Sequence, residues 1–388
     1  MKIIYISFLN ELDRPGYKNK IHSQVEALRD LGNETYLYTI SGDNILFYEF
    51  LENEISTNTS KLKHKRIIKS KNIFDEMFLI KEFVNNFKEI VNTVKPDIVY
   101  IRRIVPITPW ILGLIDWLRK KNVYVAYEYP TYPWKREMIV TRKKLFYYID
   151  SFLYEKLFSK VNQLVVFGEY DGSHPKVVET MNGVDVKKFG THFKKRSDNH
   201  LTLIAVGHIM PQHGYDKLIK GLGEYYKNPN RKRKVFINIV GPEGNGVDLK
   251  ALATSYNVEK YIKFWGFQTG VHLDEIFDES DIGVDCLALN RIETTNIVGS
   301  LKSREYLARG IPFIFAGNLD FIKKEKRNLD FVLEVDEYKE YVDIDRVIEF
   351  FDECVNSPNE IRDYAEKYLS WKKMMKPVIE KYLMDTQE

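Results

Sequence analysis

Short apolar runs alternate with longer amphipathic segments along this chain, and this alternation constrains its fold more than any other feature. Residues 2–8 and 35–40 are expected to be strands, and 21–31 has the apolar spacing of a helix that ends at Gly32. Strand–helix–strand order of this kind gives a parallel sheet with helices on both faces. A second parallel sheet is expected to open near residue 201, so the sequence predicts two α/β domains.

The stretch 300–312 predicts a short loop, a helix and then a strand that is buried on both faces. Gly310 supplies the helix C-cap just past the last turn. Free backbone N–H groups at the helix start, together with the charge of Lys302, favour an anion there. Glu305 lies about one turn further on, where a carboxylate can accept two hydrogen bonds from a ribose diol. The combination predicts a site for a nucleoside diphosphate.

This stretch resembles the LK-x-x-EYLA-x-G-x-P segment of the GT4-type glycosyltransferases. The matching residues are Leu301, Lys302, Glu305, Tyr306, Leu307, Ala308, Gly310 and Pro312. A second segment, Asn182-Gly183-Val184-Asp185 followed by Phe189, resembles the interdomain segment of the same family. The Asn-Gly pair is expected to form a tight turn with a positive φ.

The resemblance implies the GT-B fold, which has two Rossmann-like domains with a cleft between them and a C-terminal helix that crosses back. Residues 1–182 are then the acceptor-binding domain and residues 183–365 the nucleotide-sugar-binding domain. Residues 366–388 are the helix that packs back on the first domain.

The activity implied by the resemblance is that of a retaining, metal-independent hexosyltransferase. Its donor is a nucleotide sugar, with a UDP-sugar expected, and its acceptor is a hydroxyl of a glycan or a lipid-linked saccharide in cell-surface polysaccharide or glycoconjugate synthesis. No cofactor is expected beyond this substrate, and the net charge of +3 argues against a nucleic-acid partner. Two alternatives stay open: an inactive GT-B paralogue that partners another transferase, and a GT-B sugar-nucleotide epimerase.

The donor-binding residues implied by the resemblance lie mostly in the second half of the chain. They are Gly16 in the first loop and then Gly207, His208, His213, Gly241, Pro242, Gly266, Phe267, Ser300, Leu301, Lys302 and Glu305. His208 and His213 stand where the family usually has Arg and Lys, so both are catalytic candidates that are expected to carry charge beside the diphosphate. The family's usual first glutamate is Ile297 here, which leaves the contacts of the donor sugar open.

The acceptor site is expected at the end of the strand 123–128. This strand delivers Glu128 and the loop after it to the carboxyl edge of the sheet. Glu128 is the candidate that takes a proton from the acceptor hydroxyl or binds it; the alternative is a strand-end carboxylate that caps the next helix. Tyr17 and Tyr132 are further acceptor candidates, with Tyr132 stacking on a sugar ring. The helix expected over 143–158 is either core-facing, which we favour, or interfacial.

Several other chemistries lose support. The two cysteines, Cys286 and Cys354, give neither a disulfide framework nor zinc spacing, and no G-x-S-x-G nucleophile elbow occurs. Asp343-Ile344-Asp345 is expected to be a helix N-cap region and not a metal site. No apolar run is long enough to span a bilayer, so a cytoplasmic protein is expected. The basic run 61–71 is either a solvated strand or a contact with the anionic inner membrane face.

Overall fold

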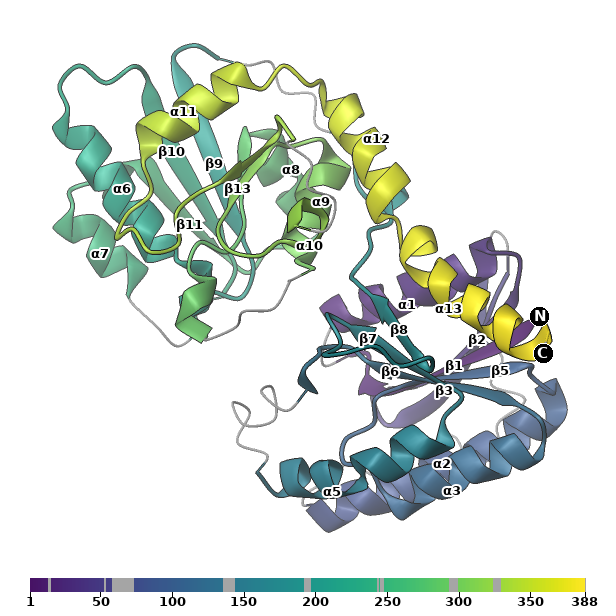
Figure 1. Ribbon diagram of the computed structural model, residues 1–388. Coiled ribbons are helices and arrows are strands. Elements are labelled where there is room, and N and C mark those ends of the chain that lie inside the picture. The colour runs from purple at the N-terminus through teal and green to yellow at the C-terminus, as the bar shows by residue number, and fades with distance from the viewer. Residues whose placement is uncertain are drawn as a thin grey trace. The chain divides into compact units, whose positions relative to one another are not determined.

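The computed structural model divides the chain into two compact units (Figure 1). The first unit combines residues 1–181 with 371–388, and the second is the continuous stretch 182–370. The structure describes residues 1–12, 15–51, 54–57, 73–134, 144–191, 197–242, 244, 248–292, 299–323 and 329–387.

The first unit is built on an eight-stranded sheet with the order β4-β3-β2-β1-β5-β6-β7-β8. Its strands are β1 (Lys2–Asn10), β2 (Glu34–Ser41), β3 (Asn44–Phe50), β4 (Ile55–Thr57), β5 (Ile98–Arg102), β6 (Tyr124–Tyr129), β7 (Gln163–Phe167) and β8 (Val177–Thr180). Its helices are α1 (Pro15–Asp30), α2 (Ile73–Val94), α3 (Pro109–Lys120), α5 (Lys144–Lys160) and α13 (Trp371–Gln387). In the part of the sheet with the order β2-β1-β5-β6-β7-β8, all neighbouring strands are parallel. The strand β3 is antiparallel to both of its neighbours, β2 and β4.

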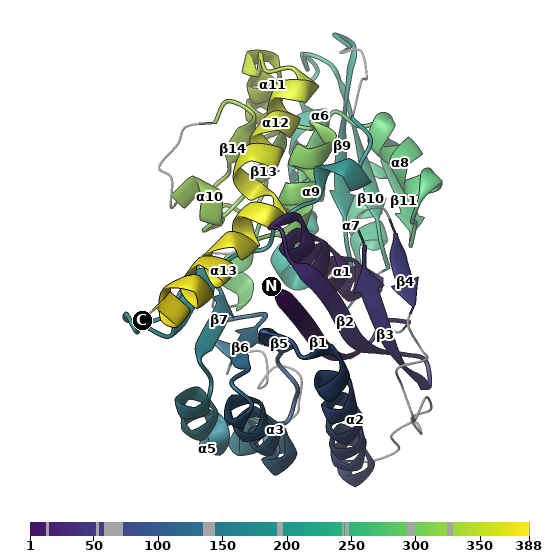
Figure 2. The same cartoon turned by 90° about the vertical axis from the view of Figure 1, so that its right-hand side faces the viewer.

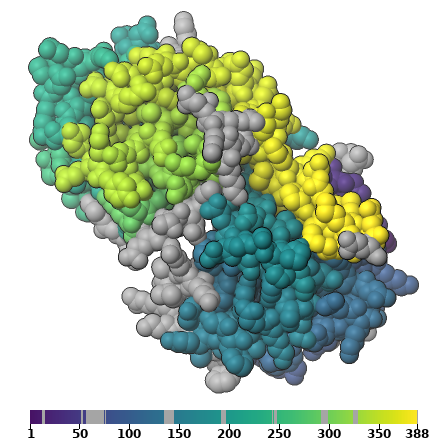
Figure 3. Space-filling view, in the orientation of Figure 1, coloured from purple at the N-terminus to yellow at the C-terminus, as the bar shows by residue number. Residues whose placement is uncertain are grey.

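Helices cover both faces of this sheet, and β1 shows how its side chains are divided. Ile4 and Ile6 join the core beneath α2, α3 and α5, while Ile3 and Tyr5 join the core beneath α1 and α13 (Figures 1 and 2). Successive side chains of a strand point to opposite faces, so a strand covered on both sides must be apolar throughout. The last helix, α13, is part of the first unit and appears in yellow in Figure 3. Its Trp371 is buried in the core beneath α1.

The second unit has a six-stranded parallel sheet with the order β11-β10-β9-β12-β13-β14. Its strands are β9 (His200–Val206), β10 (Lys234–Val240), β11 (Ile262–Gly266), β12 (Ile282–Val284), β13 (Phe313–Phe315) and β14 (Val332–Glu334). Its helices are α6 (Tyr215–Lys227), α7 (Leu249–Ser255), α8 (Val271–Asp278), α9 (Leu301–Arg309), α10 (Asp320–Lys323), α11 (Ile344–Glu353) and α12 (Pro358–Leu369). Short 3₁₀ turns are η2 (Val186–Lys188), η3 (Pro211–His213), η4 (Glu259–Tyr261) and η5 (Leu289–Ile292).

The order of these six strands is the 3-2-1-4-5-6 order of a Rossmann sheet, counted along this unit. The chain winds outward from β9 to β10 and β11, then returns to start β12 on the other side of β9. The strands β9 and β12 are neighbours, and the loops that follow them at the carboxyl edge lead to opposite sides of the sheet. Open α/β sheets bind ligands at such a switch point.

Two local predictions in the first unit differ from the structure. The first helix begins at Pro15 and not near residue 21, because proline is well suited to the first turn of a helix, where its missing N–H costs nothing. The sequence analysis also missed the antiparallel hairpin of β2 and β3, in which Ser41 faces Asn44 and Gly42 has a φ of 60°.

The positive φ predicted for the Asn182-Gly183 pair is wrong, because neither residue is among the described residues with a positive φ. The segment is instead fixed by Asn182, whose Nδ2 donates to Gly299 O at 2.6 Å and whose carbonyl accepts from Arg304 Nε at 3.0 Å. The predicted N-cap at Asp343 is confirmed, since its side chain accepts the N–H of Arg346.

The basic run 61–71 lies outside the described residues. In the part of the chain that the structure describes, no helix combines the length and the apolarity needed to cross a bilayer.

Candidate functional site

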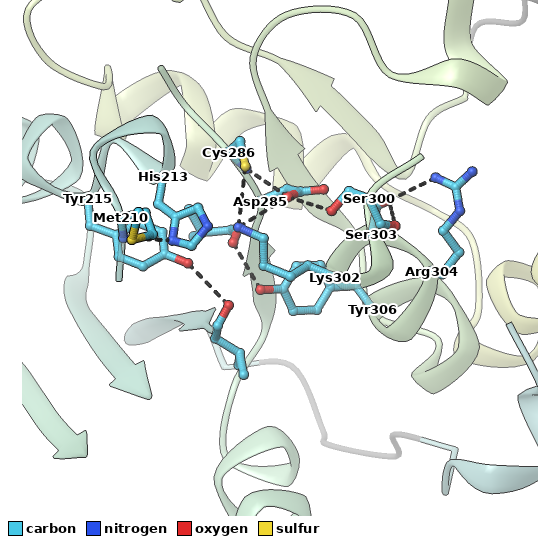
Figure 4. A network of polar contacts seen from close by, with 12 residues as sticks. Met210, His213, Tyr215, Asp285, Cys286, Ser300, Lys302, Ser303, Arg304 and Tyr306 are labelled. Carbon is cyan, nitrogen blue, oxygen red and sulfur yellow. Dashed lines mark hydrogen bonds and ion pairs between the residues drawn. The ribbon is translucent and has the colours of Figure 1, made fainter. Parts of the chain in front are cut away.

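Predicted donor residues from two segments, the loop after β9 and the start of α9, meet at the switch point of the second sheet, beside Asp285. Gly207 and His208 follow β9, Asp285 follows β12, and α9 begins at Leu301. Asp285 lies beside Ser300 and Lys302 at the start of α9 (Figure 4). A Cβ on Gly207 would contact Cε1 of His213 at 3.7 Å and Cδ of Lys302 at 3.8 Å. Side chains from the loop after β9 and from α9 therefore flank the same backbone position.

Three glycines form the sheet edge next to this point. Gly207, Gly241 and Gly266 lie at the carboxyl ends of β9, β10 and β11, with φ values of 137°, 136° and 66°. They are joined in a row, since Gly207 N donates to Val240 O at 2.9 Å and Gly241 N to Gly266 O at 2.7 Å. A Cβ on Gly241 would lie 1.9 Å from the carbonyl oxygen of Gly207, so no larger residue fits there without displacing the backbone.

Lys302 is held at the start of α9 by a residue that the sequence analysis did not single out. Its Nζ lies 3.3 Å from Oδ1 of Asp285 and 3.5 Å from Sγ of Cys286 (Figure 4). The same Oδ1 accepts the hydroxyl of Ser300 at 2.9 Å and the N–H of Cys286 at 2.8 Å. Asp285 is thus the centre of a network that fixes both the cation and the first residue of the helix.

This network also explains why the N-terminus of α9 has no side-chain cap. Ser300 is the N-cap residue, and a serine there ordinarily accepts a hydrogen bond from an N–H of the first turn. Its hydroxyl instead points to Asp285, and the Ser300 side chain makes no cap hydrogen bond. The backbone N–H groups and the positive end of the helix dipole are therefore left for an anion. At the other end Gly310 adopts the left-handed conformation with a φ of 79°, as predicted.

Burial and neighbouring groups set the charges of Lys302 and His213 in this network. Burial lowers the pKa of Lys302, but Cys286, Tyr215 and Asp285 outweigh it, so the net pKa lies well above its ordinary value and the amine stays charged. Burial, with the nearby Lys302, lowers the pKa of His213 to about 3. Without a ligand the imidazole of His213 is therefore neutral at neutral pH, because a cation already lies beside it. Its charge beside a bound diphosphate stays a prediction.

The tautomer of His213 follows from one hydrogen bond. Its Nδ1 accepts the N–H of Met210 at 3.3 Å (Figure 4). A neutral imidazole carries its proton on the other nitrogen, so Nε2 is a hydrogen-bond donor. His213 can thus offer an N–H to a phosphate oxygen without carrying charge. His208 is exposed, and its role stays a prediction.

Glu305 is anchored on the same helix as Lys302. Its Oε1 accepts from Nε of Arg309 at 3.0 Å and from a terminal nitrogen of Arg309 at 2.9 Å. Burial raises the pKa of Glu305, although Arg309 acts in the opposite sense. The side chain of Glu305 is 23 % exposed. Arg309 thus fixes the orientation of the carboxylate, which is still accessible to a ligand. Arg309 was not predicted, and its spacing of four residues from Glu305 on one helix is the signal that indicates the pair.

Other predicted donor residues lie around this centre. Pro242 follows Gly241 and accepts a hydrogen bond from Ile209 N at 3.0 Å, while Leu301 and Phe267 are exposed. Their contacts with a donor stay predictions. Ile297 lies outside the described residues, as do the nearby Glu293 and Asn296, which could serve the donor sugar.

Gly16 does not form the expected phosphate-binding turn. It is the second residue of α1, its φ is not positive, and a Cβ there would meet open space. A side chain would therefore be tolerated, and nothing in the conformation requires glycine.

Glu128 is buried within the first sheet and does not reach a surface. Its Oε1 accepts from Arg102 at 2.5 Å, and its Oε2 accepts from Tyr5, Gln24 and Tyr100, each at 2.9 Å. The residue is 0 % exposed. Protein donors thus occupy both oxygens, because a carboxylate buried without them would be strongly destabilising. Neither the acceptor role nor the helix-cap role finds support in this arrangement.

The two aromatic acceptor candidates, Tyr17 and Tyr132, lie near the carboxyl edge of the first sheet. Tyr17 is 41 % exposed on α1, and its ring lies 5.8 Å from the guanidinium of Arg102. Tyr132 is half-buried and packs against Tyr170, with 5.5 Å between the ring centres. Their roles stay predictions.

The described residues show no metal site, but they line a large cavity. They contain no group of three histidine, cysteine or carboxylate side chains with the geometry of a metal site. A cavity of about 690 Å³ lies at the amino edge of the first sheet, where Lys95, Arg119 and Asp385 are among its lining residues. This edge is opposite to the one that carries the predicted acceptor residues.

Comparison with known proteins gives no match by sequence, either to a protein-family model or to a curated protein. Solved structures do match. The sucrose-phosphate synthase of Thermosynechococcus elongatus has a TM-score of 0.68 at 12% identity, covering 100% of this chain and 99% of that one. The chain has the GT-B fold.

Two other GT-B structures match over almost the whole chain. A glycosyltransferase from Rickettsia africae has a TM-score of 0.65 at 14% identity, covering 98% of this chain and 97% of its own. The Anabaena protein HepE, solved in complex with UDP-glucose, has a TM-score of 0.57 at 12% identity and covers 98% of both chains. At such identities the likeness concerns the fold.

Proposed function

We propose that this chain is a glycosyltransferase that moves a sugar from a nucleotide donor to an acceptor hydroxyl. The observation that carries the proposal is the start of α9, where uncapped N–H groups, a charged Lys302 and an anchored Glu305 lie at the switch point of a Rossmann sheet. The solved structures with this fold support it, and HepE was solved with UDP-glucose. A UDP-sugar is accordingly the donor that we propose.

Each group at this site has a role toward such a donor. The helix N-terminus and Lys302 would hold the diphosphate, because one N–H of the ammonium is directed to Asp285 and a second to Sγ of Cys286, which leaves the third for a phosphate oxygen. His213 would add a neutral N–H through Nε2. Glu305 would accept the ribose hydroxyls with the carboxylate that Arg309 orients. The glycine row lets the donor approach the backbone closely.

The reaction then depends mainly on positioning and on stabilising the leaving group. The acceptor oxygen bonds to the anomeric carbon, the bond from that carbon to the diphosphate breaks, and the hydroxyl proton is released. Negative charge grows on the diphosphate, where the helix dipole and Lys302 lie ready for it without rearrangement. We propose that these groups suffice without a metal ion and that the sugar is transferred with retention, to a glycan or a lipid-linked saccharide.

Thermal stability in the presence of nucleotides tests this proposal. The melting temperature should rise with one nucleoside diphosphate and its sugars, because a ligand that binds only the folded state stabilises it. Lys302→Met should reduce the rise, because it weakens nucleotide binding. Lys234→Met removes the same charge at the amino edge of the same sheet and should retain it.

No shift with any nucleotide would overturn the donor site and favour an inactive partner of another transferase. Incubation of the stabilising nucleotide sugar without an acceptor covers the other alternative. An epimerised nucleotide sugar would contradict the transferase proposal.

A further inference from the structure

The helix α5 carries apolar side chains on its outer face as well as on its inner face. Phe146 and Leu157 are buried against the sheet. Leu145, Tyr148 and Phe152 are 54 %, 67 % and 85 % exposed, and their spacing of three and four residues places them in one stripe along the helix. A helix that covers a sheet ordinarily presents polar residues outward. The stripe is therefore unlike a solvated helix face.

The neighbouring helices extend this face. α2, α3 and α5 lie side by side on one side of the sheet (Figures 1 and 2). They lead into the parallel neighbours β5, β6 and β7, so all three begin toward the carboxyl edge of the sheet. Phe78 in the first half of α2 is 54 % exposed, and Trp110 in the first turn of α3 is partly exposed. We call the outer face of these three helices the apolar helix surface.

Lysine and arginine side chains are interspersed with these apolar groups. Lys81 lies one turn from Phe78, and Lys156 lies one turn from Phe152. Among the described residues of the three helices and the residue after α3, the exposed cations are Lys81, Arg119, Lys120, Lys121 and Lys156, and Glu155 is the exposed acid. Asp116 is neutralised by Lys160 at 2.5 Å.

Trp117, in the last turn of α3, is flanked by two cations. Nζ of Lys88 lies 5.8 Å from the ring centre of Trp117, and Nζ of Lys121 lies 5.0 Å from it. Aromatic rings beside lysines are typical of the boundary between lipid tails and headgroups, where ring and ammonium each find a favourable environment. The core of a protein interface is depleted in lysine instead.

We propose that the apolar helix surface docks on an anionic lipid bilayer. Leu145, Tyr148 and Phe152 enter the headgroup boundary, and the exposed cations attract anionic headgroups. The inference rests on the proposed function in one respect. The apolar residues lie toward the carboxyl edge of the first sheet, where the acceptor is expected, so docking places that edge beside a lipid-linked acceptor.

Sedimentation with lipid vesicles tests the surface on the full chain. The variant Tyr148→Ser/Phe152→Ser removes the two most exposed aromatics of α5. A matched control, Tyr338→Ser/Val355→Ser, changes two residues that are 79 % and 84 % exposed in the second unit. Vesicles of phosphatidylcholine, alone or mixed with phosphatidylglycerol, separate the apolar contribution from the electrostatic one. Melting curves of both variants confirm that each is folded.

The wild type and the control should bind the mixed vesicles and should bind less at high salt. The α5 variant should bind at least about tenfold more weakly, because the binding free energy from burying one aromatic side chain already corresponds to more than a tenfold change in affinity. Equal binding by the α5 variant and the control, or no binding by the wild type to the mixed vesicles, would overturn the proposal. Self-association that only the α5 variant abolishes would also overturn it, in favour of a second copy.

The nucleotide melting experiment keeps this failure distinct from a failure of the proposed function. Vesicle binding without any nucleotide shift would retain the surface and overturn the donor site. A nucleotide shift without vesicle binding would do the reverse.

Discussion

Replacement of Lys302 by methionine separates what this residue does for the fold from what it does for a nucleotide. The side chains of Lys302 and Asp285 are 16 % and 2 % exposed, and their charged atoms lie 3.3 Å apart. At that distance and an effective dielectric constant of about 20, the attraction is about 5 kcal/mol. Removing one partner of a buried pair leaves the other charge uncompensated, which costs about 3–5 kcal/mol. Lys302→Met should therefore lower the free energy of unfolding by about that amount.

The second change, Asp285→Asn, removes the charge that Lys302→Met leaves behind. The amide oxygen of the new side chain can still accept from Ser300 and from the N–H of Cys286, so the rest of the network survives. The double variant should recover most of the lost stability in urea unfolding, measured without ligand. Nucleoside diphosphate binding, measured by calorimetry, should stay weakened roughly tenfold to a hundredfold in both variants, because a hydrogen bond to a charged group contributes about 1.5–3 kcal/mol.

Two results would refute this reasoning separately. If Lys302→Met is as stable as the double variant, the ion pair does not stabilise the start of α9 as its burial indicates. If the double variant binds the nucleotide as well as the wild type does, Lys302 is not a phosphate ligand.

Three further predictions follow from the same site. Glu305→Ala should weaken donor binding about tenfold to a hundredfold in calorimetry, and unchanged binding would contradict the ribose assignment. Burial and Lys302 depress the pKa of His213 from 6.5 to about 3, so its contribution to stability is complete above pH 6.5 and is lost as the pH falls toward 3, by up to about 1.4 kcal/mol per pH unit. Urea unfolding at pH 7 and pH 5 should show this loss in the wild type and not in His213→Gln; equal losses would argue against a buried neutral imidazole. Gly241→Ala should lower the free energy of unfolding by at least about 1–3 kcal/mol, because its Cβ would lie 1.9 Å from the oxygen of Gly207. In the control Gly190→Ala the new Cβ meets no atom within 4 Å, so stability should hardly change. Equal denaturation midpoints of the two variants would contradict the close packing of the glycine row.

The segment around α9 could be predicted almost residue by residue because its signals are local. Gly310 ends the helix in the left-handed conformation, and the apolar run after Pro312 forms β13. The charge at His213 could not be predicted in the same way. It depends on burial and on Lys302, which the fold brings to His213 from a distant part of the sequence.

Side-chain contacts between residues of different elements were the main feature that could not be predicted from the sequence. Glu128 was correctly placed in a strand, but its partners Arg102, Tyr5 and Gln24 come from other elements, and only the packed sheet shows that they fill its surroundings. Asp285 was not singled out, because its link to Ser300 depends on β12 ending beside the start of α9. The β2–β3 hairpin is different, because its turn residues gave a local signal that was overlooked.

The place of α13 in the first unit has a consequence for how the protein is made. A ribosome synthesises residues 1–181 first, but the core beneath α1 also needs Trp371, Met375 and Val378, which emerge only after the whole second unit. The second unit is continuous in sequence and can close its own core while the first still exposes an apolar face. Expression of the first unit alone should therefore require that residues 371–387 be joined to it, and a fragment that stops at residue 181 should aggregate.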